Sequence, residues 1–494
     1  MDLFVNQQNF HSLISYFLGN YKKFLLKSFS ENTKKDPRKK EASRLILNLK
    51  PDFSADSFPP FRLLSSKFLD FVKFSHLLKK WLGIWFRIKF FDIPYCIFPP
   101  SQDEVAHLIE NDDSPDKIKI NCCRHCKYRN LCGGIHKRYL QKYGEREFRA
   151  VPDVPFQIMI EVEPRCNLNC QACFNRNSFA RTDRTLSISL KTPLLREIIE
   201  ETARLKIPTI RFTGGEPLLR PDIYDLLAYA KSKGLYIGLN SNGTLIDETT
   251  AKKLNGIVDT ILISIQGMGK IGDEAVGKEG ATQSKIKALF SLKELAKTEI
   301  VIATVLGPKI IGEKDSNPDE LDKIYKLIKN VDCISRWHLC RRIAEKKESY
   351  RENSEDYKKI VNKLIDWQLG KKNFRLHHYP YVISNGIPFC FYDMDRVDLV
   401  SYGGIFVDGY SRLSIDPNGN IKPIYYSPLI LSNDPRNILG AWNHPFIRNY
   451  RDLKFLPSAC RDCFYKRKCL GGNRFLAKLV SGDYAAPDPL RPIE

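Results

Sequence analysis

The sequence lacks the long apolar runs and the leader that would direct a chain into or across a membrane. No apolar stretch approaches the about 20 residues that a membrane-spanning helix needs, and the first residues, Met-Asp-Leu-Phe, lack the organisation of a signal peptide. Glycine and proline are modest, at 28 each among 494 residues with 43% apolar content, so the chain can bury a large core. We therefore expect a cytoplasmic protein, soluble or at most peripheral to a membrane, with about three folded units.

Nucleic-acid-binding motifs are also absent, although the formal net charge is +21, so we expect no specific nucleic-acid partner. The first ninety residues carry seventeen Lys or Arg against seven Asp or Glu, and 33–40 is predicted to be an exposed linker. Residues 64–88 have a helical period, with a basic face opposite a face of Phe, Leu and Trp. This basic amphipathic helix either packs on the core with its charges in water, or lies on an anionic membrane or an acidic partner.

Cysteine is abundant, and most of the fourteen cysteines have the spacing of metal ligands. Such spacing favours a reducing cytoplasm over disulfides. Cys166, Cys170 and Cys173 form Cys-x3-Cys-x2-Cys directly after an apolar, strand-like run at 156–162. Three thiolates so placed can hold three corners of a cubane iron–sulfur cluster and leave its fourth iron open to a small molecule. A zinc site is the alternative, since Cys-x2-Cys is common in zinc-binding chains.

A second motif follows about forty residues later, where a short predicted strand at 208–213 runs into Gly214, Gly215, Glu216 and a proline. A double glycine and a carboxylate allow the backbone to approach a bound amino acid while Glu216 meets its ammonium. Together the two motifs resemble those of the radical S-adenosylmethionine (radical SAM) superfamily. The resemblance implies that the first motif holds a [4Fe-4S] cluster and that the second grips the methionyl amino group of SAM.

The resemblance implies further SAM contacts at two strand ends. Ser241 and Asn242 follow the third strand and Ser264 ends the fourth, where the family contacts the ribose and carboxylate of SAM. An ordinary polar strand end or turn is the alternative for each serine. Two positions depart from the family pattern, because Ala172 stands where an aromatic residue is usual and Gln266 where many relatives carry an acid. No catalytic side chain is assigned.

The segment around these motifs has the order and period of an α/β sheet. A helix is predicted at 192–205, with Thr192 as N-cap and Pro193 at the first helical position. About six βα units are too few for a closed eight-stranded barrel and suit the open, partial (β/α)6 TIM-like barrel of the superfamily. The predicted strands are 156–162, 207–213, 235–240, 260–265, 299–305 and 332–339, and a further helix is predicted at 354–367.

An internal repeat flanks this core. Each copy reads Ile-Pro-aromatic-Cys, then Cys-x2-Cys-x5-Cys, then a pair of glycines, which indicates duplication of one cluster-binding module. Four thiolates can close a cluster completely; zinc is the alternative, and the adjoining radical SAM loop favours iron. The N-terminal copy supplies Cys96, Cys123, Cys126 and Cys132, and the C-terminal copy supplies Cys390, Cys460, Cys463 and Cys469.

The C-terminal copy resembles the auxiliary-cluster region of SPASM and twitch domains, and a predicted strand–turn–strand at 413–421 supports this. A full SPASM domain would place cysteines near Ile424 and at Asn473, so we expect one auxiliary cluster here and a second in the N-terminal copy. Three cysteines remain. Cys122 adjoins the N-terminal ligands and could be an alternative ligand. Cys333 and Cys340 are expected in the core, with a substrate-facing Cys340 as the alternative.

Four parts are predicted along the chain. They are a basic, partly amphipathic extension at 1–90, an N-terminal auxiliary Fe-S module at 91–152, a radical SAM core at 153–370, and a C-terminal SPASM/twitch-like Fe-S domain at 371–494.

The resemblance implies an oxidoreductase that cleaves SAM reductively. The resulting 5′-deoxyadenosyl radical would remove hydrogen from a substrate C–H bond, and two auxiliary [4Fe-4S] clusters would accept the remaining electron. It also implies an electron donor such as ferredoxin or flavodoxin. A precursor peptide or protein is the first substrate class, and biosynthesis of a tetrapyrrole-type cofactor or of a lipid is the alternative. A non-enzymatic iron–sulfur carrier would have no use for Gly214, Gly215 and Glu216.

Overall fold

The structure is a computed structural model that separates into two compact units, one ending at Asp153 and the other beginning at Val154. The four-part division of the chain remains a prediction. No helix among the described residues is long and apolar enough to cross a membrane. The described residues are 29–30, 45–49, 61, 86–97, 109–110, 114–173, 189–294, 297–307, 310, 320–343, 354–369, 381–384, 386–404 and 409–491.

The second unit is built on one sheet of nine strands in the order β13-β12-β11-β10-β9-β8-β7-β14-β15. From β13 to β14 all neighbours run parallel, and β15 pairs antiparallel with β14. All six predicted strands are confirmed to within about two residues at their ends, and so is the α/β class with a partial barrel. They are β7 (Gln157–Glu163), β8 (Thr209–Gly214), β9 (Tyr236–Ser241), β10 (Thr260–Ser264), β11 (Glu299–Leu306) and β12 (Ile334–Arg341), with β13 (Tyr381–Ile383) beyond them.

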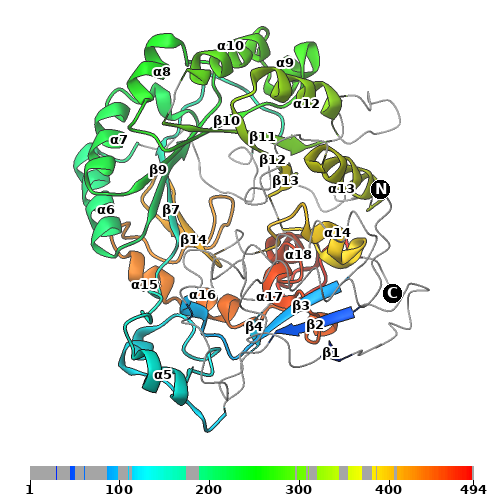
Figure 1. Ribbon diagram of the computed structural model, residues 1–494. Helices are drawn as coiled ribbons and strands as arrows, with labels where there is room; N and C mark the ends of the chain where they lie inside the picture. Colours follow the sequence, from blue (N-terminus) through cyan, green and yellow to red (C-terminus); the bar gives the residue numbers. More distant parts are fainter. Residues whose placement is uncertain are drawn as a thin grey trace. The chain divides into compact units, whose positions relative to one another are not determined.

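Helices cover the outer face of this curved sheet, and none of the helices in the described part of the chain covers the inner face between β7 and β12 (Figure 1). Outward side chains such as Ile210, Phe212 and Ile261 are fully buried in the main core, because alternate residues of a strand point to opposite faces. The covering helices are α6 (Thr192–Arg204), α7 (Ile223–Ser232), α8 (Glu248–Leu254), α9 (Gly269–Val276), α10 (Ala281–Lys293), α12 (Glu320–Val331) and α13 (Ser354–Leu369).

The start of α6 corrects one detail. Lys191, and not Thr192, is the N-cap, and Thr192 is the first helical residue. The Thr192 hydroxyl donates to Asp222 and accepts from Nη2 of Arg220 at 3.2 Å. These tertiary bonds draw the hydroxyl away from the helix end that it would otherwise cap.

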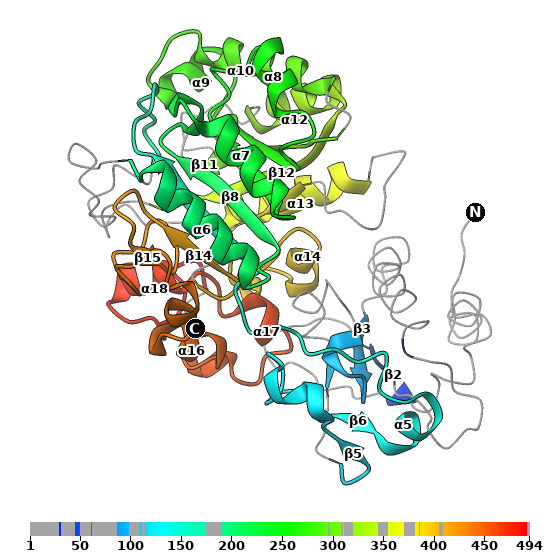
Figure 2. The same cartoon turned by 90° about the vertical axis from the view of Figure 1, so that its left-hand side faces the viewer.

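The C-terminal region completes the same unit, since β14 (Arg412–Ile415) extends the sheet beside β7 and turns into β15 (Ile421–Lys422), as predicted. Arg341 at the end of β12 makes two hydrogen bonds to Asp488, of 2.9 and 2.8 Å, and both side chains are fully buried. This ion pair ties the last part of the chain to the sheet. The remaining helices are α14 (Met394–Asp398), α15 (Ile438–Trp442), α16 (Pro445–Arg451), α17 (Lys466–Cys469) and α18 (Arg474–Ser481), several of which are seen in Figure 2.

The first unit contains two small sheets and the short helix α5 (Lys137–Tyr143). One sheet has the order β1-β2-β3-β4, with β1 (Phe29–Ser30), β2 (Leu45–Leu49), β3 (Phe86–Phe91) and β4 (Ile109–Glu110), and the other pairs β5 (Lys117–Ile118) with β6 (Ile135–His136). The predicted helix at 64–88 is wrong at its end, because 86–88 belong to β3 and pair with β2. Its remainder and the predicted linker at 33–40 lie outside the described residues.

Candidate functional site

The loop that carries Cys166, Cys170 and Cys173 begins where β7 ends, and backbone hydrogen bonds fasten it to the loop after β8. The amide of Gly215 donates to the carbonyl of Glu163 at 2.7 Å, and the amide of Glu216 donates to the carbonyl of Arg165 at 2.8 Å. The two sequence motifs therefore form one structure, in which the second motif supports the start of the first.

Both glycines are required by this close approach. A Cβ atom on Gly214 would lie 2.3 Å from the carbonyl oxygen of Glu163, and a Cβ on Gly215 would lie 2.1 Å from that of Arg165. Gly214 also has a φ of +147°, which side-chain-bearing residues rarely adopt. The sequence predicted that these glycines let the backbone approach a bound amino acid. In the structure, the group that they approach is the backbone of the cysteine loop.

The loop after β9 holds the cysteine loop from a second side through Asn242. The Nδ2 atom of Asn242 donates to Oδ1 of Asn167 at 2.8 Å and lies 3.8 Å from Sγ of Cys166. Its Oδ1 atom accepts from the amide and the hydroxyl of Thr244, at 2.9 and 2.7 Å, and Asn167 also donates to that hydroxyl. Asn242, predicted to contact SAM, is therefore placed beside the first cysteine.

The end of α9 holds the loop from a third side. The amides of Asn169 and Gln171 donate to the carbonyls of Val276 and Ala275, at 2.9 and 3.0 Å. Leu168 packs against Val276 and Ala281 in a small buried cluster that Cys170 joins. The backbone from 165 to 173 is thus fixed before any cluster binds, which reduces the entropy lost on ligation.

The thiols of this loop have an environment that suits an iron–sulfur cluster. Burial raises the pKa of the Cys166 thiol, and the nearby Glu216 carboxylate and Cys173 raise it further. Ligation by iron would offset the free energy needed to ionise the thiol, because the metal charge stabilises the thiolate. Cys170 and Cys173 remain partly accessible, so the donor set fits a cubane with one iron left open.

Glu216 is fully buried, and its carboxylate is already engaged by protein donors. Its Oε1 atom accepts from the Ser241 hydroxyl at 2.9 Å and the Leu218 amide at 3.1 Å, and its Oε2 atom accepts from the Asn242 amide at 2.7 Å. Burial raises its pKa, which these hydrogen bonds oppose. Its contact with the SAM ammonium remains a prediction, and the role that the structure gives it is to join the loops after β8 and β9.

The two predicted serines differ in their surroundings. Ser241 is buried, and its hydroxyl donates to Glu216 and accepts from the amide of Gly243 at 3.0 Å. Ser264 is partly exposed, and its hydroxyl makes no hydrogen bond to any described residue. Gln266, which departs from the family pattern, accepts from the amide of Val305 at 2.9 Å and so links the β10 loop to β11. Ser264 therefore has the hydroxyl that is free for a ligand.

Lys285 is a buried lysine near the cysteine loop that the sequence analysis did not single out. It lies on α10 with 2% exposure, and its Nζ atom is buried without a hydrogen-bond partner. Burial lowers its pKa, while the nearby Cys170, Glu216 and Cys166 favour the charged form. A buried ammonium without a hydrogen-bond partner is costly, so this position suits an anionic group. Its spacing from Ala288, Leu289 and Leu292, which share the buried face of α10, was the sequence signal that could have found it.

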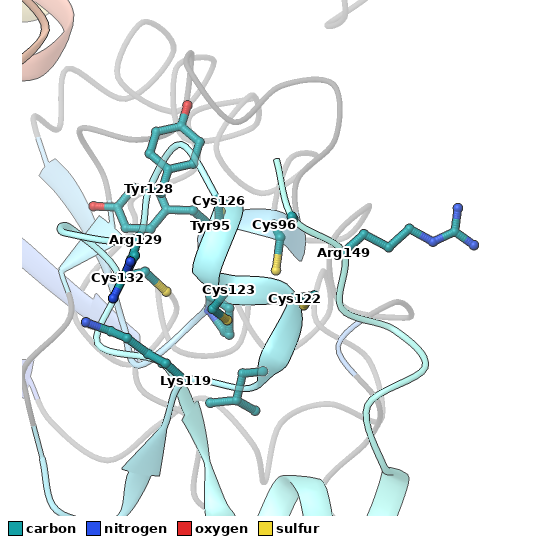
Figure 3. Close-up of a pocket in the computed structure, with 14 residues that line it drawn as sticks. Tyr95, Cys96, Lys119, Cys122, Cys123, Cys126, Tyr128, Arg129, Cys132 and Arg149 are labelled. Atoms are coloured by element: carbon teal, nitrogen blue, oxygen red, sulfur yellow. The ribbon is translucent and has the colours of Figure 1, made fainter. Parts of the chain in front are cut away.

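The N-terminal quartet of Cys96, Cys123, Cys126 and Cys132 is brought together in the first unit. All four line one pocket with Cys122, and Figure 3 shows the sulfurs of Cys96 and Cys132 pointing into the same space. Tyr95 and Tyr128 stack beside it at 4.8 Å. Burial, followed by repulsion from Cys132, raises the pKa of Cys96 to about 12. These crowded thiols resist ionisation, and a bound metal would favour their ionised form because its positive charge stabilises thiolates.

Cationic side chains share that pocket with the cysteines. Lys119 and Arg129 lie near Cys132, whereas the guanidinium of Arg149 points away (Figure 3). Four thiolates on a [4Fe-4S]²⁺ core carry a net charge of about −2, which nearby lysine and arginine stabilise. Cys122 donates to the carbonyl of Phe148 at 3.8 Å, so its thiol has a protein partner.

The C-terminal quartet is assembled in the same way within the second unit. Burial is the main cause that raises the pKa of the Cys390 thiol to about 11, and it also raises the pKa of the Cys469 thiol. Other cysteines of the quartet raise the pKa of both thiols further by repulsion. The amide of Phe389 donates to Sγ of Cys469 at 3.4 Å. Arg491 favours the thiolates of Cys390 and Cys460. The thiols of each quartet thus lie close enough to raise one another's pKa, and ligation of a cluster by either quartet remains a prediction.

Two positions explain why this region offers one quartet. Asn473, where a full SPASM domain would place a cysteine, is fully buried and caps α18 by accepting from the Leu476 amide at 3.0 Å. Ile424 is buried with Tyr426 and Phe475. Within the described ranges, no three His, Cys, Asp or Glu side chains converge as the ligands of a single metal ion do. A cubane instead takes its thiolates on separate irons.

The two remaining cysteines flank β12. Cys333 is partly buried against the main core, as expected. Cys340 lies on the inner-face side of β12, and its Sγ is 3.2 Å from the Ser384 hydroxyl. Burial raises the pKa of the Cys340 thiol, so it stays protonated at neutral pH.

Comparison with known proteins agrees with this geometry. Residues 160–328 match the sequence model of the Radical SAM superfamily. An AdoMet-dependent heme synthase of Methanosarcina barkeri is 26% identical over 355 residues, which cover 69% of this chain and 97% of the relative. A PqqA peptide cyclase of Gluconobacter oxydans is 25% identical over 350 residues, covering 69% of this chain and 91% of the relative.

Solved structures share the fold at low sequence identity. Streptococcus suis SuiB bound to its precursor peptide SuiA superposes with a TM-score of 0.52 at 18% identity, over 71% of this chain and 77% of that chain. The structure of anSMEcpe with bound AdoMet gives 0.53 at 18% identity, over 68% and 90% of the two chains. These likenesses support the partial barrel.

Replacement of Glu216 tests the joint between the loops. Glu216→Ala leaves the Ser241 hydroxyl and the Asn242 amide without their acceptor, so we expect SAM affinity to fall by at least about tenfold and the melting temperature to drop. Equilibrium dialysis with labelled SAM and thermal unfolding measure the two effects. The exposed Glu248→Ala on α8 is the control. An unchanged SAM affinity would show that this carboxylate does not shape the site.

Replacement of Lys285 should move stability and ligand binding in opposite directions. Lys285→Met removes a buried ammonium that has no partner, so the SAM-free protein should become more stable. The same change should weaken SAM binding by at least about tenfold, and Lys285→Arg should restore part of it. Lys287→Met, exposed on the same helix, should change neither. Equal SAM affinity of the wild type and Lys285→Met would refute this role.

Proposed function

The chain belongs to the radical SAM superfamily, and we propose that it oxidatively modifies a C–H bond of a peptide or protein substrate. The observation that carries the proposal is the joint between the Cys166–Cys173 loop and the Gly214–Glu216 loop, which hold each other through backbone hydrogen bonds. When bound, a reduced [4Fe-4S] cluster and SAM supply a 5′-deoxyadenosyl radical that abstracts hydrogen from an unactivated C–H bond.

The side chains of this chain would position that chemistry. Cys166, Cys170 and Cys173 would ligate three irons. Lys285 would hold the SAM carboxylate in a site from which water is largely excluded, where a charge-assisted bond is strong. Ser264 and Asn242 would contact the remaining polar groups of SAM. Glu216 would hold the loops after β8 and β9 together through its bonds to Ser241 and Asn242.

The two cysteine quartets would hold auxiliary [4Fe-4S] clusters. Hydrogen abstraction leaves an unpaired electron on the substrate, and an oxidised product forms only when this electron is removed. Four thiolates from each quartet would leave a bound cluster without an open iron for substrate, so the chemistry that it would supply is electron transfer. A ferredoxin or flavodoxin would supply electrons to the SAM-binding cluster. Contact of the basic N-terminal segment with an anionic membrane remains a prediction, since residues 62–85 lie outside the described part.

The relatives support two substrate classes. The PqqA peptide cyclase and the precursor-peptide complex of SuiB support a peptide. The heme synthase and an Fe-coproporphyrin III synthase of Methanosarcina barkeri, 30% identical over 172 residues, favour a tetrapyrrole as the second candidate. Transfer of deuterium from a labelled peptide or porphyrin into 5′-deoxyadenosine distinguishes them.

Cysteine variants separate the roles of the clusters without a known substrate. With dithionite as reductant, the wild type should cleave SAM slowly to 5′-deoxyadenosine. Replacing Cys166, Cys170 and Cys173 together by Ala should abolish this cleavage, because no site for SAM remains. Replacing Cys460 and Cys463 by Ala is the matched control, and it should leave most of the cleavage intact. Cleavage by the triple variant would overturn the proposed function.

A further inference from the structure

Four basic side chains gather on the inner face of the sheet in the second unit. Their neighbours in sequence, such as Ile210, Phe212, Trp337 and Leu413, are buried in the core on the outer face, so strand alternation directs the basic residues inward. They come from three strands that are not neighbours in the sheet. The cluster consists of Arg211 on β8, Arg336 and His338 on β12, and Arg412 on β14.

Arg211 has a neutral partner. Its Nη1 atom donates to Oδ1 of Asn240 at 2.9 Å, and it makes no ion pair with any described residue. Its guanidinium lies against Gly238 of the neighbouring strand, where an added Cβ would be 2.7 Å from Cζ of Arg211. Glycine at this place therefore keeps the inner face open for the arginine side chain.

Arg336 has one acidic partner, Glu299 of β11. Its Nη2 atom donates to the Glu299 carboxylate at 2.6 Å, which also accepts from Thr260 at 3.3 Å. The Nε atom of Arg336 is buried without a hydrogen-bond partner. A side-chain hydrogen bond with Tyr402 also engages Arg336, and its Nε donor remains unused.

His338 lies among these arginines. Its Nε2 atom is buried without a hydrogen-bond partner, and its ring centroid lies 6.2 Å from that of Tyr402 in an edge-to-face arrangement. Burial, together with the charges of Arg336, Arg211 and Arg412, lowers its pKa to about 3. The histidine is therefore neutral at pH 7, and one ring nitrogen remains available to donate to an anion.

Polar donors on this face remain without acceptors among the described residues. The Nε atom of Arg336 and the Nε2 atom of His338 are buried without a hydrogen-bond partner, and Arg211 bonds to the neutral side chain of Asn240. The inner positions of β14 and β7 add Arg412 and the buried Glu161. Partly buried cations need a counter-charge, because desolvation is only offset by pairing.

The cluster adjoins the predicted SAM site in the strand register. His338 is level with Ala303 of β11, which is level with Ser264 of β10. All three occupy inner positions. A group bound at His338 and Arg336 would therefore lie on the same face as the predicted SAM contact at Ser264, two strands away.

We propose that this inner-face cluster binds a carboxylate group of the substrate. The inference rests on the proposed function, since it assumes that the substrate is modified on this face. Arg211 and Arg336 would offer paired N–H donors to the two oxygens, and His338 would donate a third hydrogen bond. The carboxylate could belong to an acidic residue of a peptide or to a propionate of a tetrapyrrole, and the test separates these two sources.

Binding to matched charged and neutral probes tests the proposal on the reconstituted full chain without SAM. The probes are iron coproporphyrin III and its tetramethyl ester, and a glutamate-rich peptide and its glutamine counterpart. We expect one acidic probe to bind at least about tenfold more tightly than its neutral counterpart. Arg211→Gln should weaken that binding by about tenfold, and Arg211→Lys should restore part of it. Arg196→Gln, exposed on the outer helix α6, should have no effect.

The outcomes are distinct. Equal affinity for acid and neutral probes, binding of none of the four, or undiminished binding by Arg211→Gln would overturn the carboxylate site. Should Arg211→Gln fail to fold, as judged by iron content and dithionite-driven SAM cleavage, the wild-type comparison of acid with neutral probe still decides. Failure of the proposed function would instead appear as a wild type that binds the acidic probe yet cannot cleave SAM.

Discussion

The site depends on one buried carboxylate, that of Glu216. It accepts hydrogen bonds from the side chain of Ser241 and the backbone of Asn242, and thereby joins the loops after β8 and β9. Asn242 then reaches the cysteine loop after β7. Three strand ends are in this way locked into one surface, and Gly214 and Gly215 allow them to approach closely. A site so preorganised loses little conformational entropy when a cluster and SAM bind.

The two cysteine quartets extend the chemistry of this site. Each gathers four thiols whose burial opposes ionisation, so a cluster bound there would couple its assembly to local folding. If Cys390 and Cys469 ligate one cluster, as we propose, the duplicated motif combines a redox role with a structural one, because the cluster would hold together distant segments of the chain. The basic inner face has a different proposed role, which is to bind a carboxylate group of the substrate on the same face as the predicted SAM site.

The sequence predicted the parts of the fold that follow from strand alternation and ligand spacing. The six strands were recovered because their buried residues repeat at every second position, and the quartets because cysteine spacing is diagnostic. It missed what tertiary contacts decide. Thr192 looked like an N-cap, but Arg220 and Asp222 engage its hydroxyl. Lys285 was not singled out, although it shares the apolar face of α10 with Leu289 and Leu292. Arg211 and Arg336 were not singled out either, because the contacts that bury them come from distant strands and leave no local signal.

We expect the chain to hold three cubane clusters, one of them with an open iron. Iron, acid-labile sulfide and zinc, measured per chain after anaerobic reconstitution and desalting, test it most directly. Three [4Fe-4S] clusters predict about twelve irons and about twelve sulfides with negligible zinc. About four irons with stoichiometric zinc would contradict the account, because the quartets would then be structural zinc sites.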